Sequence, residues 1–215
     1  MTMVVEPAVH LVDDEAPVRD ALAFLFHAHG LAWRTYASGP EFLAASDAAP
    51  LRGCIVLDVR MEPMSGLQVH DALLARGVAL PVLFLSGHGD IPMAVDALKK
   101  GAFDFIEKPF GDAALVERVQ RALRLEASQH VARSDGERIA ARLASLTERE
   151  QEVMQRVAAG RLNKVIADDL GIAVRTVEVH RARVYAKLGV RSAAEVATLL
   201  AQAGGDQKHH QARGR

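Results

Sequence analysis

The stretch that decides the fold reads Cys54-Ile55-Val56-Leu57-Asp58-Val59-Arg60-Met61. Its apolar residues form a continuous run, which is typical of a strand buried on both faces of a parallel sheet. Such sheets bind ligands just beyond the carboxyl ends of their strands, and Asp58 stands at that end. Two interpretations are open. Asp58 is either a reactive carboxylate at the sheet edge or a polar residue that ends the strand or caps the next helix.

The composition is that of a globular protein with a substantial core. The chain has 215 residues, enough for two domains, and is 50% hydrophobic and 25% charged. Its single cysteine allows no disulfide within the chain, which suits the cytoplasm. The first residues lack a signal-peptide pattern, and no apolar run approaches the roughly 18 residues of a membrane span. We therefore expect a cytoplasmic protein without membrane contact.

The net charge of −1 conceals an asymmetry between two halves of the chain. Residues 1–125 carry 16 acidic and 11 basic side chains, whereas residues 126–215 carry 11 acidic and 15 basic ones. An acidic first half and a basic second half favour a regulatory domain joined to a nucleic-acid binder.

Residues 1–125 alternate between strand-like and helix-like segments. Apolar runs that resemble strands occur at residues 9–12, 32–36, 54–58, 81–85 and 103–106. A helical pattern follows each run, so that five strands alternate with five helices. This alternation predicts a doubly wound five-stranded parallel α/β domain. In a sheet of order 2-1-3-4-5, the point where the strand order reverses lies between the first and third strands.

Polar residues follow the predicted strand ends. Asp13 and Asp14 follow the first strand, Asp58 ends the third, Ser86 the fourth and Lys108 the fifth. Three carboxylates at one edge repel, by about 4 kcal/mol for a pair at ~4 Å and an effective dielectric of 20. They therefore call for a divalent cation, and such oxygen ligands favour Mg²⁺. The ammonium and the hydroxyl can bind the oxygens of an incoming phosphoryl group.

With Pro109 after Lys108, these positions resemble the receiver domain of two-component response regulators. The runs at residues 86–95 and 105–110 are similar to the FixJ branch of that family. The resemblance implies that Asp58 accepts a phosphoryl group from a sensor histidine kinase, and that the Lys108–Pro109 bond is cis. It also implies the Mg²⁺ ligands: Asp14, Asp58 and the backbone carbonyl of Arg60 directly, and Asp13 through water.

The resemblance further implies how phosphorylation is transmitted. Ser86 would hydrogen-bond the phosphoryl group, and the aromatic ring of Phe105 would follow it inward. The face formed by the fourth helix and fifth strand would then dimerise. Three residues are expected in that interface: Ile91, Val95 and Lys99. Such a receiver catalyses only its own phosphotransfer and dephosphorylation, so we do not expect an enzyme. Arg60 and His88 are hypothesised to tune the phosphoryl lifetime.

Residues 126–143 are predicted to be a linker, either helical or plain. Helix-forming residues dominate the segment, which favours a continuation of the last receiver helix. Gly136 predicts a break, after which a short second helix would follow.

Residues 144–205 read as short helices only. Thr147 and Glu150 form a capping-box pattern, and Asn163 is predicted to cap the second helix. A third helix should run from Val174 or Arg175 to Leu188, and a fourth to about residue 203. Residues 206–215 are predicted to be a disordered tail. Two short helices joined by a tight glycine turn indicate a helix-turn-helix, here in an all-α four-helix domain.

The third of these helices has a cationic outward face. Such a face suits the major groove of DNA, although a solvated basic surface is the alternative. The motifs at residues 146–150, 163–167 and 175–183 resemble the LuxR/NarL four-helix DNA-binding domain. The resemblance implies base contacts from Glu178, Val179 and Ala182, with Arg181 as an addition. It implies phosphate contacts from Asn163, Lys164, Thr176, Arg183 and Lys187.

The sequence therefore predicts a transcription regulator, switched by phosphorylation, that dimerises and binds promoter DNA with RNA polymerase as a further partner. One rival is an aspartyl-phosphate hydrolase, which would resemble the haloacid dehalogenase family. That family needs a second acid two residues after its nucleophile, where this chain has Arg60. Another rival is a phosphate-independent DNA binder with a vestigial receiver, against which the intact acidic residues argue.

Overall fold

The computed structural model describes the backbone of residues 5–87 and 91–212. The side chains of Ile91 and of residues 205–212 are not described, and His88 lies outside the described residues. The predictions made for Ile91 and His88 therefore have no structural counterpart. The chain divides into two compact units, Met1–Gln129 and His130–Arg215.

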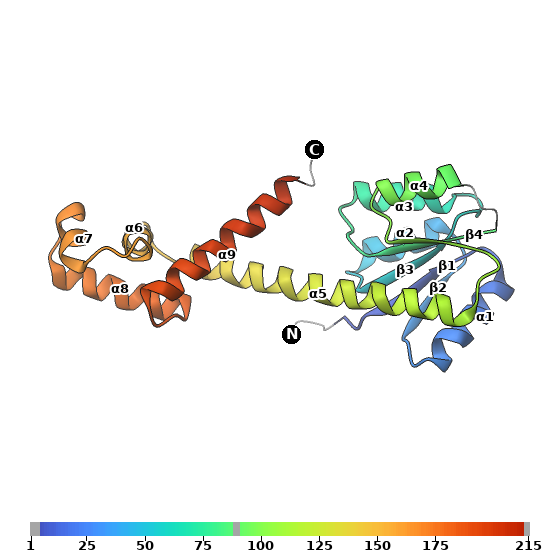
Figure 1. Cartoon of the computed structure of the whole chain (residues 1–215), viewed down its shortest axis with the longest axis horizontal. Helices are drawn as coiled ribbons and strands as arrows, with labels where there is room; N and C mark the ends of the chain where they lie inside the picture. The colour runs from blue at the N-terminus through green and yellow to red at the C-terminus, as the bar shows by residue number, and fades with distance from the viewer. Residues whose placement is uncertain (1–4, 88–90, 213–215) are drawn as a thin grey trace. The chain divides into compact units, whose positions relative to one another are not determined.

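The first unit is built on one parallel sheet (Figure 1). Its strands are β1 (Ala8–Val12), β2 (Trp33–Tyr36), β3 (Gly53–Asp58), β4 (Val82–Ser86) and β5 (Asp104–Glu107). The order is β2-β1-β3-β4-β5, as predicted. The register of the paired strands places Val12 beside Leu57, Asp58 beside Leu85 and Ser86 beside Glu107. The carboxyl ends of the central strands therefore meet at one edge.

Helices cover both faces of this sheet. They are α1 (Ala16–Ala28), α2 (Gly39–Ala48), α3 (Gly66–Ala75), α4 (Ile91–Lys99) and α5 (Asp112–Ala144). Because successive strand residues point to opposite faces, the apolar strands supply two cores. Phe26 of α1 and Leu115 of α5 pack in one core, and Phe42 of α2, Leu73 of α3 and Ala97 of α4 in the other.

Helix α5 differs from its predicted form. It runs unbroken from Asp112 to Ala144, so the predicted break near Gly136 and the separate second helix were wrong. A single glycine inside a helix costs only about 1 kcal/mol relative to alanine, and the neighbouring residues are strong helix formers. Beyond the glycine, Ile139 and Leu143 gain further support by packing against the core of the second unit.

The second unit is entirely helical in its described part. After the end of α5, its helices are α6 (Glu148–Ala158), α7 (Asn163–Leu170), α8 (Val174–Leu188) and α9 (Ala193–Ala212). Their buried stripes share one core that includes Val153, Ile166, Val177 and Val184. Glycines with left-handed backbones end α7 and α8, as the helix-turn-helix pattern predicted.

The helix ends confirm one predicted cap and correct two other features. Thr147 and Glu150 form the capping box at the start of α6. Asn163 is not a cap, since Leu162 holds the cap position of α7 and Asn163 lies in its first turn. Helix α9 continues to Ala212, past the predicted end and into the predicted disordered tail, where Gln, Lys and Ala residues favour a helix. Every helix of the described ranges is too short or too polar to cross a membrane.

Candidate functional site

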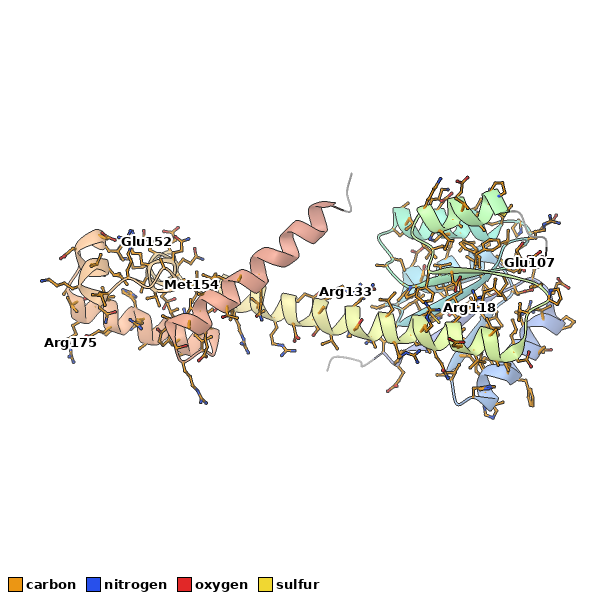
Figure 2. The ribbon with its side chains drawn as sticks, viewed as in Figure 1. Glu107, Arg118, Arg133, Glu152, Met154 and Arg175 are labelled. Carbon is orange, nitrogen blue, oxygen red and sulfur yellow. The ribbon has the colours of Figure 1, made fainter. Side chains whose placement is uncertain are left out.

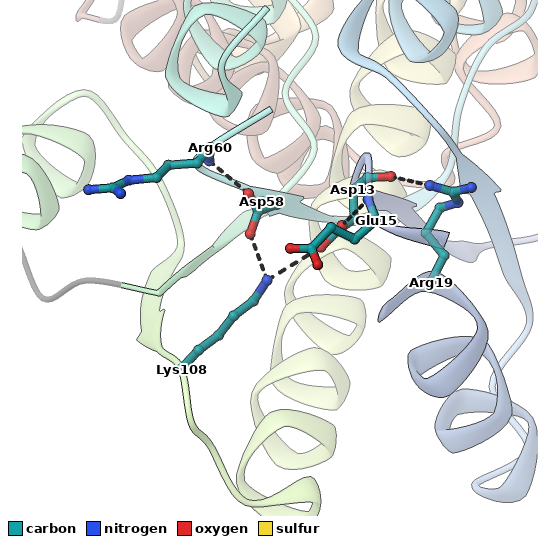
Figure 3. Close-up of polar contacts among 6 residues, drawn as sticks. All are labelled: Asp13, Glu15, Arg19, Asp58, Arg60 and Lys108. Carbon is teal, nitrogen blue, oxygen red and sulfur yellow. Dashed lines mark hydrogen bonds and ion pairs between the residues drawn. The ribbon is translucent and has the colours of Figure 1, made fainter. Parts of the chain in front are cut away.

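The carboxyl ends of β1, β3 and β5 bring two carboxylates and an ammonium together (Figure 3). Lys108 Nζ donates to Asp58 Oδ1 at 2.7 Å and to Asp13 Oδ2 at 3.4 Å. Both aspartates are buried, whereas the lysine side chain is 24% exposed. Buried carboxylates need a balancing cation, so the lysine stabilises a pair that would otherwise repel.

The second oxygen of each carboxylate is held by a backbone amide two residues further on. Asp13 Oδ1 accepts from Glu15 N at 2.8 Å, and Asp58 Oδ2 accepts from Arg60 N at 2.7 Å. In addition, Arg19 donates to the carbonyl oxygen of Asp13. These bonds fix both carboxylates, so that their other oxygens point at the same ammonium.

Burial and the neighbouring charges together set the pKa values of Asp13 and Lys108. It raises the pKa of Asp13, an effect that the Glu15 amide and the charge of Lys108 partly oppose. Burial by itself lowers the pKa of Lys108. The hydrogen bond and charge of Asp58, together with Asp13, outweigh that effect and raise the pKa above its ordinary value. The lysine therefore remains a cation at neutral pH.

A divalent cation fits two of the three predicted carboxylates well. Asp13 and Asp58 already direct one oxygen each toward a common positive charge, and hard cations such as Mg²⁺ prefer such oxygens. Asp14 is exposed, and its Oδ2 accepts from Glu62 N at 3.3 Å. Among the described residues, no three acidic, histidine or cysteine side chains form a ready metal cluster.

The loop after Asp58 depends on a glycine whose role the sequence reasoning missed. Gly66 N donates to Val59 O at 3.0 Å, and a Cβ on this glycine would lie 2.1 Å from Asp58 O. Only glycine permits this close approach. The loop borders an open pocket lined by Asp14, Val59, Arg60, Met61, Glu62, Ser65, Leu67 and Met93. Gly66 is also the first residue of α3, and its second role follows only from the backbone contact.

The remaining receiver residues lie around this centre. Ser86 is buried, and its carbonyl oxygen accepts from Lys108 N at 2.7 Å. Phe105 is half-buried with its ring 6.2 Å from that of Phe84. The Arg60 guanidinium points away from the Asp58 carboxylate (Figure 3).

The first unit has one further predicted feature, a cis peptide bond, and it also contains two residues of the expected dimer face. The Lys108–Pro109 peptide bond is cis, as the resemblance implied, and so is Glu62–Pro63. On α4, Val95 and Lys99 are both exposed.

In the second unit, α8 presents most of its predicted DNA contacts to solvent. Val177, Val184 and Leu188 are buried in the core. Figure 2 shows Arg175 at the start of α8 with its side chain extending away from the helix. The exposed residues predicted to contact DNA are Lys164, Thr176, Glu178, Val179, Ala182, Arg183 and Lys187. One outward face of α8 and the start of α7 therefore carry both apolar and cationic groups.

Three of the predicted contact residues, namely Asn163, Arg181 and Lys187, already have partners within the unit. Arg181 donates to Asn163 Oδ1 and to the hydroxyl of Tyr185, each at 2.9 Å, and its guanidinium lies over the tyrosine ring. Lys187 Nζ donates to Glu150 Oε2 at 2.6 Å. The hydrogen bond from Lys187 lowers the pKa of Glu150, so the glutamate is ionised. These contacts hold helices together, a role that the sequence reasoning did not assign.

Comparisons with known proteins agree with this architecture. Residues 9–120 match the response regulator receiver domain, and residues 144–200 match the bacterial regulatory proteins of the luxR family. The chain is 51% identical to the C4-dicarboxylate transport transcriptional regulatory protein DctR of Rhodobacter capsulatus, over 89% of this chain and 98% of that protein. It is 45% identical to the transcriptional regulatory protein FixJ of Azorhizobium caulinodans, over 91% and 92%.

A solved structure extends the likeness to three dimensions. The response regulator StyR aligns with a TM-score of 0.87 and 39% identity, covering 92% of this chain and all of that one. The matched families are transcription regulators and not enzymes, which removes the hydrolase alternative. The chain belongs to the two-component response regulators of the FixJ type, with a receiver domain and a LuxR-family helix-turn-helix DNA-binding domain.

Proposed function

We propose that Asp58 accepts a phosphoryl group from the phosphohistidine of a sensor histidine kinase. In this transfer the P–N bond of the donor breaks, and a P–O bond to the Asp58 carboxylate forms. The observation that carries the proposal is the Lys108 ammonium 2.7 Å from the Asp58 carboxylate. A fixed cation at this place can stabilise the negative charge on the transferring oxygens.

The other residues of the cluster have supporting roles in this proposal. Asp13, Asp14, Asp58 and the Arg60 carbonyl would hold Mg²⁺, which when bound supplies further positive charge to the phosphoryl oxygens. The amide hydrogen bond from Arg60 N orients the Asp58 carboxylate before the transfer. The Ser86 hydroxyl would bind a phosphoryl oxygen of the product.

We propose that phosphorylation is read out by the face of α4 and β5. Phe105 of β5 packs beside Phe84, and its ring would move further inward as Ser86 turns to the phosphoryl group. The changed face would dimerise through Ile91, Val95 and Lys99. A dimer places two DNA-binding units on half-sites about one helical turn apart and favours specific promoter binding, with RNA polymerase as the further partner.

The exposed face of α8 supports major-groove reading. We propose that Glu178, Val179 and Ala182 contact base edges, and that Lys164, Thr176 and Arg183 contact phosphates. All six side chains are exposed. We propose positioning roles for Asn163, Arg181 and Lys187, because each is already bonded to another residue of the unit.

Phosphate mapping tests the acceptor directly. The full chain is incubated with Mg²⁺ and a small acyl phosphate, and the modified residue is located by peptide mass spectrometry. We expect modification of Asp58 in the wild-type chain and none in Asp58→Asn. Equal phosphorylation of both proteins, or modification at another residue, would contradict the assignment. Asp47→Asn, an exposed surface change, is the matched control and should behave as wild type.

A further inference from the structure

The carboxyl end of α8 is bonded to the last turn of α5. Arg142 Nη1 donates to Leu188 O at 3.0 Å, at the carbonyl end of α8 where a cation is favourable. Gly189 follows with φ 67°, and a Cβ there would approach Arg142 Nη1 to 3.4 Å. The guanidinium thus lies directly against the residue that ends the helix.

A second hydrogen bond joins the ends of α5 and α8, and here the donor lies on α8. Lys187 Nζ donates to Ser145 O at 2.9 Å as well as to the buried carboxylate of Glu150. That carboxylate also accepts from Thr147 N in the capping box of α6. We call these contacts the helix-end junction, formed by Arg142, Ser145, Thr147, Glu150, Lys187 and Leu188.

Apolar packing supports the junction. Ile139 and Leu143 of α5 pack against the core that contains Val184 and Leu188 of α8. The last turns of α5 are therefore part of the DNA-binding unit, although the family match begins only at residue 144. The sequence had likewise predicted the unit to begin at residue 144, after a linker.

We propose that the last turn of α5 is a functional part of DNA binding, and that Arg142 is a positioning residue for α8. This inference rests on the proposed role of α8 in reading DNA. Arg142 would fix the carboxyl end of α8 so that the exposed amino-terminal half keeps its angle to the groove.

At a rise of 1.5 Å per residue, roughly 13 Å separate Val179 from Leu188, so a tilt of about 5° about Leu188 moves Val179 by about 1 Å. Hydrogen bonds to base edges tolerate a displacement of only a few tenths of an ångström.

A direct phosphate contact by Arg142 is the competing explanation, and it has a different signature. Losing a phosphate contact weakens binding to all sequences equally and reduces the slope of log affinity against log salt by about 1. Losing the angle of α8 weakens the preferred sequence selectively and leaves that slope unchanged.

The test uses the full chain with Arg142→Met, which keeps the side-chain length without the charge, and Arg142→Lys, which keeps the charge. Arg138→Met is the matched control, since Arg138 lies one turn earlier on α5, is exposed and pairs only weakly with Asp135 at 3.1 Å. Two DNA probes of equal length are used, namely a duplex enriched from a random pool by the wild-type protein and a random-sequence duplex. Affinity is measured over a salt series, and amide hydrogen exchange is followed in the last turn of α8.

We expect Arg142→Met to bind the enriched duplex about tenfold more weakly, with its salt slope and its affinity for the random duplex unchanged. Exchange in the last turn of α8 should be faster, Arg142→Lys should recover most of the affinity, and Arg138→Met should match wild type. Wild-type affinity in Arg142→Met, or a smaller salt slope with both duplexes weakened equally, would overturn the proposal. If Arg142→Met does not fold, Arg142→Lys decides. Wild-type amide exchange and DNA affinity in Arg142→Lys would support the charge-dependent bond, and a complete loss of affinity for the enriched duplex in this variant would refute it. If the wild type enriches no duplex at all, the proposed DNA-reading role of α8 itself fails, and this inference fails with it.

Discussion

The ammonium of Lys108 lies 2.7 Å from the carboxylate of Asp58 and 3.4 Å from that of Asp13. This one positive charge therefore contacts residues at the carboxyl ends of three strands. The two aspartates are almost fully buried, so their separation and charge are set by the fold and not by solvent. The same charge that balances them lies where the oxygens of a phosphoryl group on Asp58 would need stabilisation.

Lys108→Met removes this charge while keeping most of the side-chain volume. We expect phosphorylation of Asp58 by an acyl phosphate with Mg²⁺ to slow at least tenfold, because a hydrogen bond to a charged group contributes about 1.5–3 kcal/mol. The initial rate of phosphoprotein formation measures this. Lys108→Arg keeps the charge in a different shape and should retain part of the rate. A Met variant that is phosphorylated as fast as wild type would show that Lys108 serves only to balance charge.

Gly66→Ala tests the close approach of the loop to Asp58. The added methyl would lie 2.1 Å from Asp58 O, so the loop that also supplies the Arg60 amide must move. We expect the free energy of unfolding to fall by about 1–3 kcal/mol, and phosphorylation to slow as well. Denaturant unfolding and phosphorylation rates are the measurements. Gly111→Ala, which meets no atom within 4 Å, is the control. Equal stability of Gly66→Ala and wild type would contradict the tight contact.

The partly exposed Arg52 and the buried Glu126 form an ion pair at the other end of the sheet. Arg52 donates Nε and Nη2 to the two oxygens of Glu126, whose side chain is fully buried. Arg52→Met should lower the free energy of unfolding by about 3–5 kcal/mol, because it leaves a buried charge without a partner. Denaturant unfolding measures this loss.

Two comparisons make that prediction specific to burial. The double variant Arg52→Met with Glu126→Leu should regain much of the lost stability, since no buried charge remains. Lys100→Met breaks the exposed pair with Asp71 and should cost less than about 1 kcal/mol. If Lys100→Met costs as much as Arg52→Met, burial is not the cause.

We expect His70 to make the stability of the receiver depend on pH. Burial lowers its pKa below the ordinary value of 6.5, and its Nδ1 is buried without a hydrogen-bond partner among the described residues. The unfolded chain therefore binds a proton more readily than the folded one, and the contribution of neutral His70 is lost as the pH falls below about 6.5.

His70→Leu removes both the titration and the unpaired nitrogen. We expect its stability to fall less between pH 7.5 and 5.5 (roughly one unit either side of the ordinary histidine pKa) than that of the wild type. Thermal unfolding across this range is the measurement, and His27→Gln, at an exposed position of α1, is the control. An identical pH dependence in His70→Leu and wild type would exclude His70 as the source.

The sequence predicted those features that chain order alone determines. Asp13, Asp58 and Lys108 could be brought together because parallel strands of a known order end at one edge. The capping box of Thr147 and Glu150 depends only on neighbouring residues, and it is confirmed. These features need no knowledge of side-chain packing between distant helices.

Features that depend on packing could not be predicted in this way. The resemblance implied a phosphate contact for Lys187, but the fold brings its ammonium to Glu150, 37 residues away in the sequence. The side chain of Asn163 likewise accepts a hydrogen bond from the Arg181 guanidinium, although the sequence pattern predicted that Asn163 caps a helix. Helix α5 also continues through Gly136, and part of the reason lies in packing, since Ile139 and Leu143 pack against the core of the second unit.

The most direct test of the central claim compares the wild-type chain with Asp58→Asn, each with and without an acyl phosphate and Mg²⁺. Affinity for a duplex enriched by the phosphorylated wild type is measured together with the mass of the protein in solution. We expect phosphorylation to make the wild type dimeric and to raise its affinity at least tenfold, equivalent to about 1.4 kcal/mol, while Asp58→Asn stays monomeric and weak. Equal mass and affinity in the two proteins under both conditions would contradict a switch at Asp58.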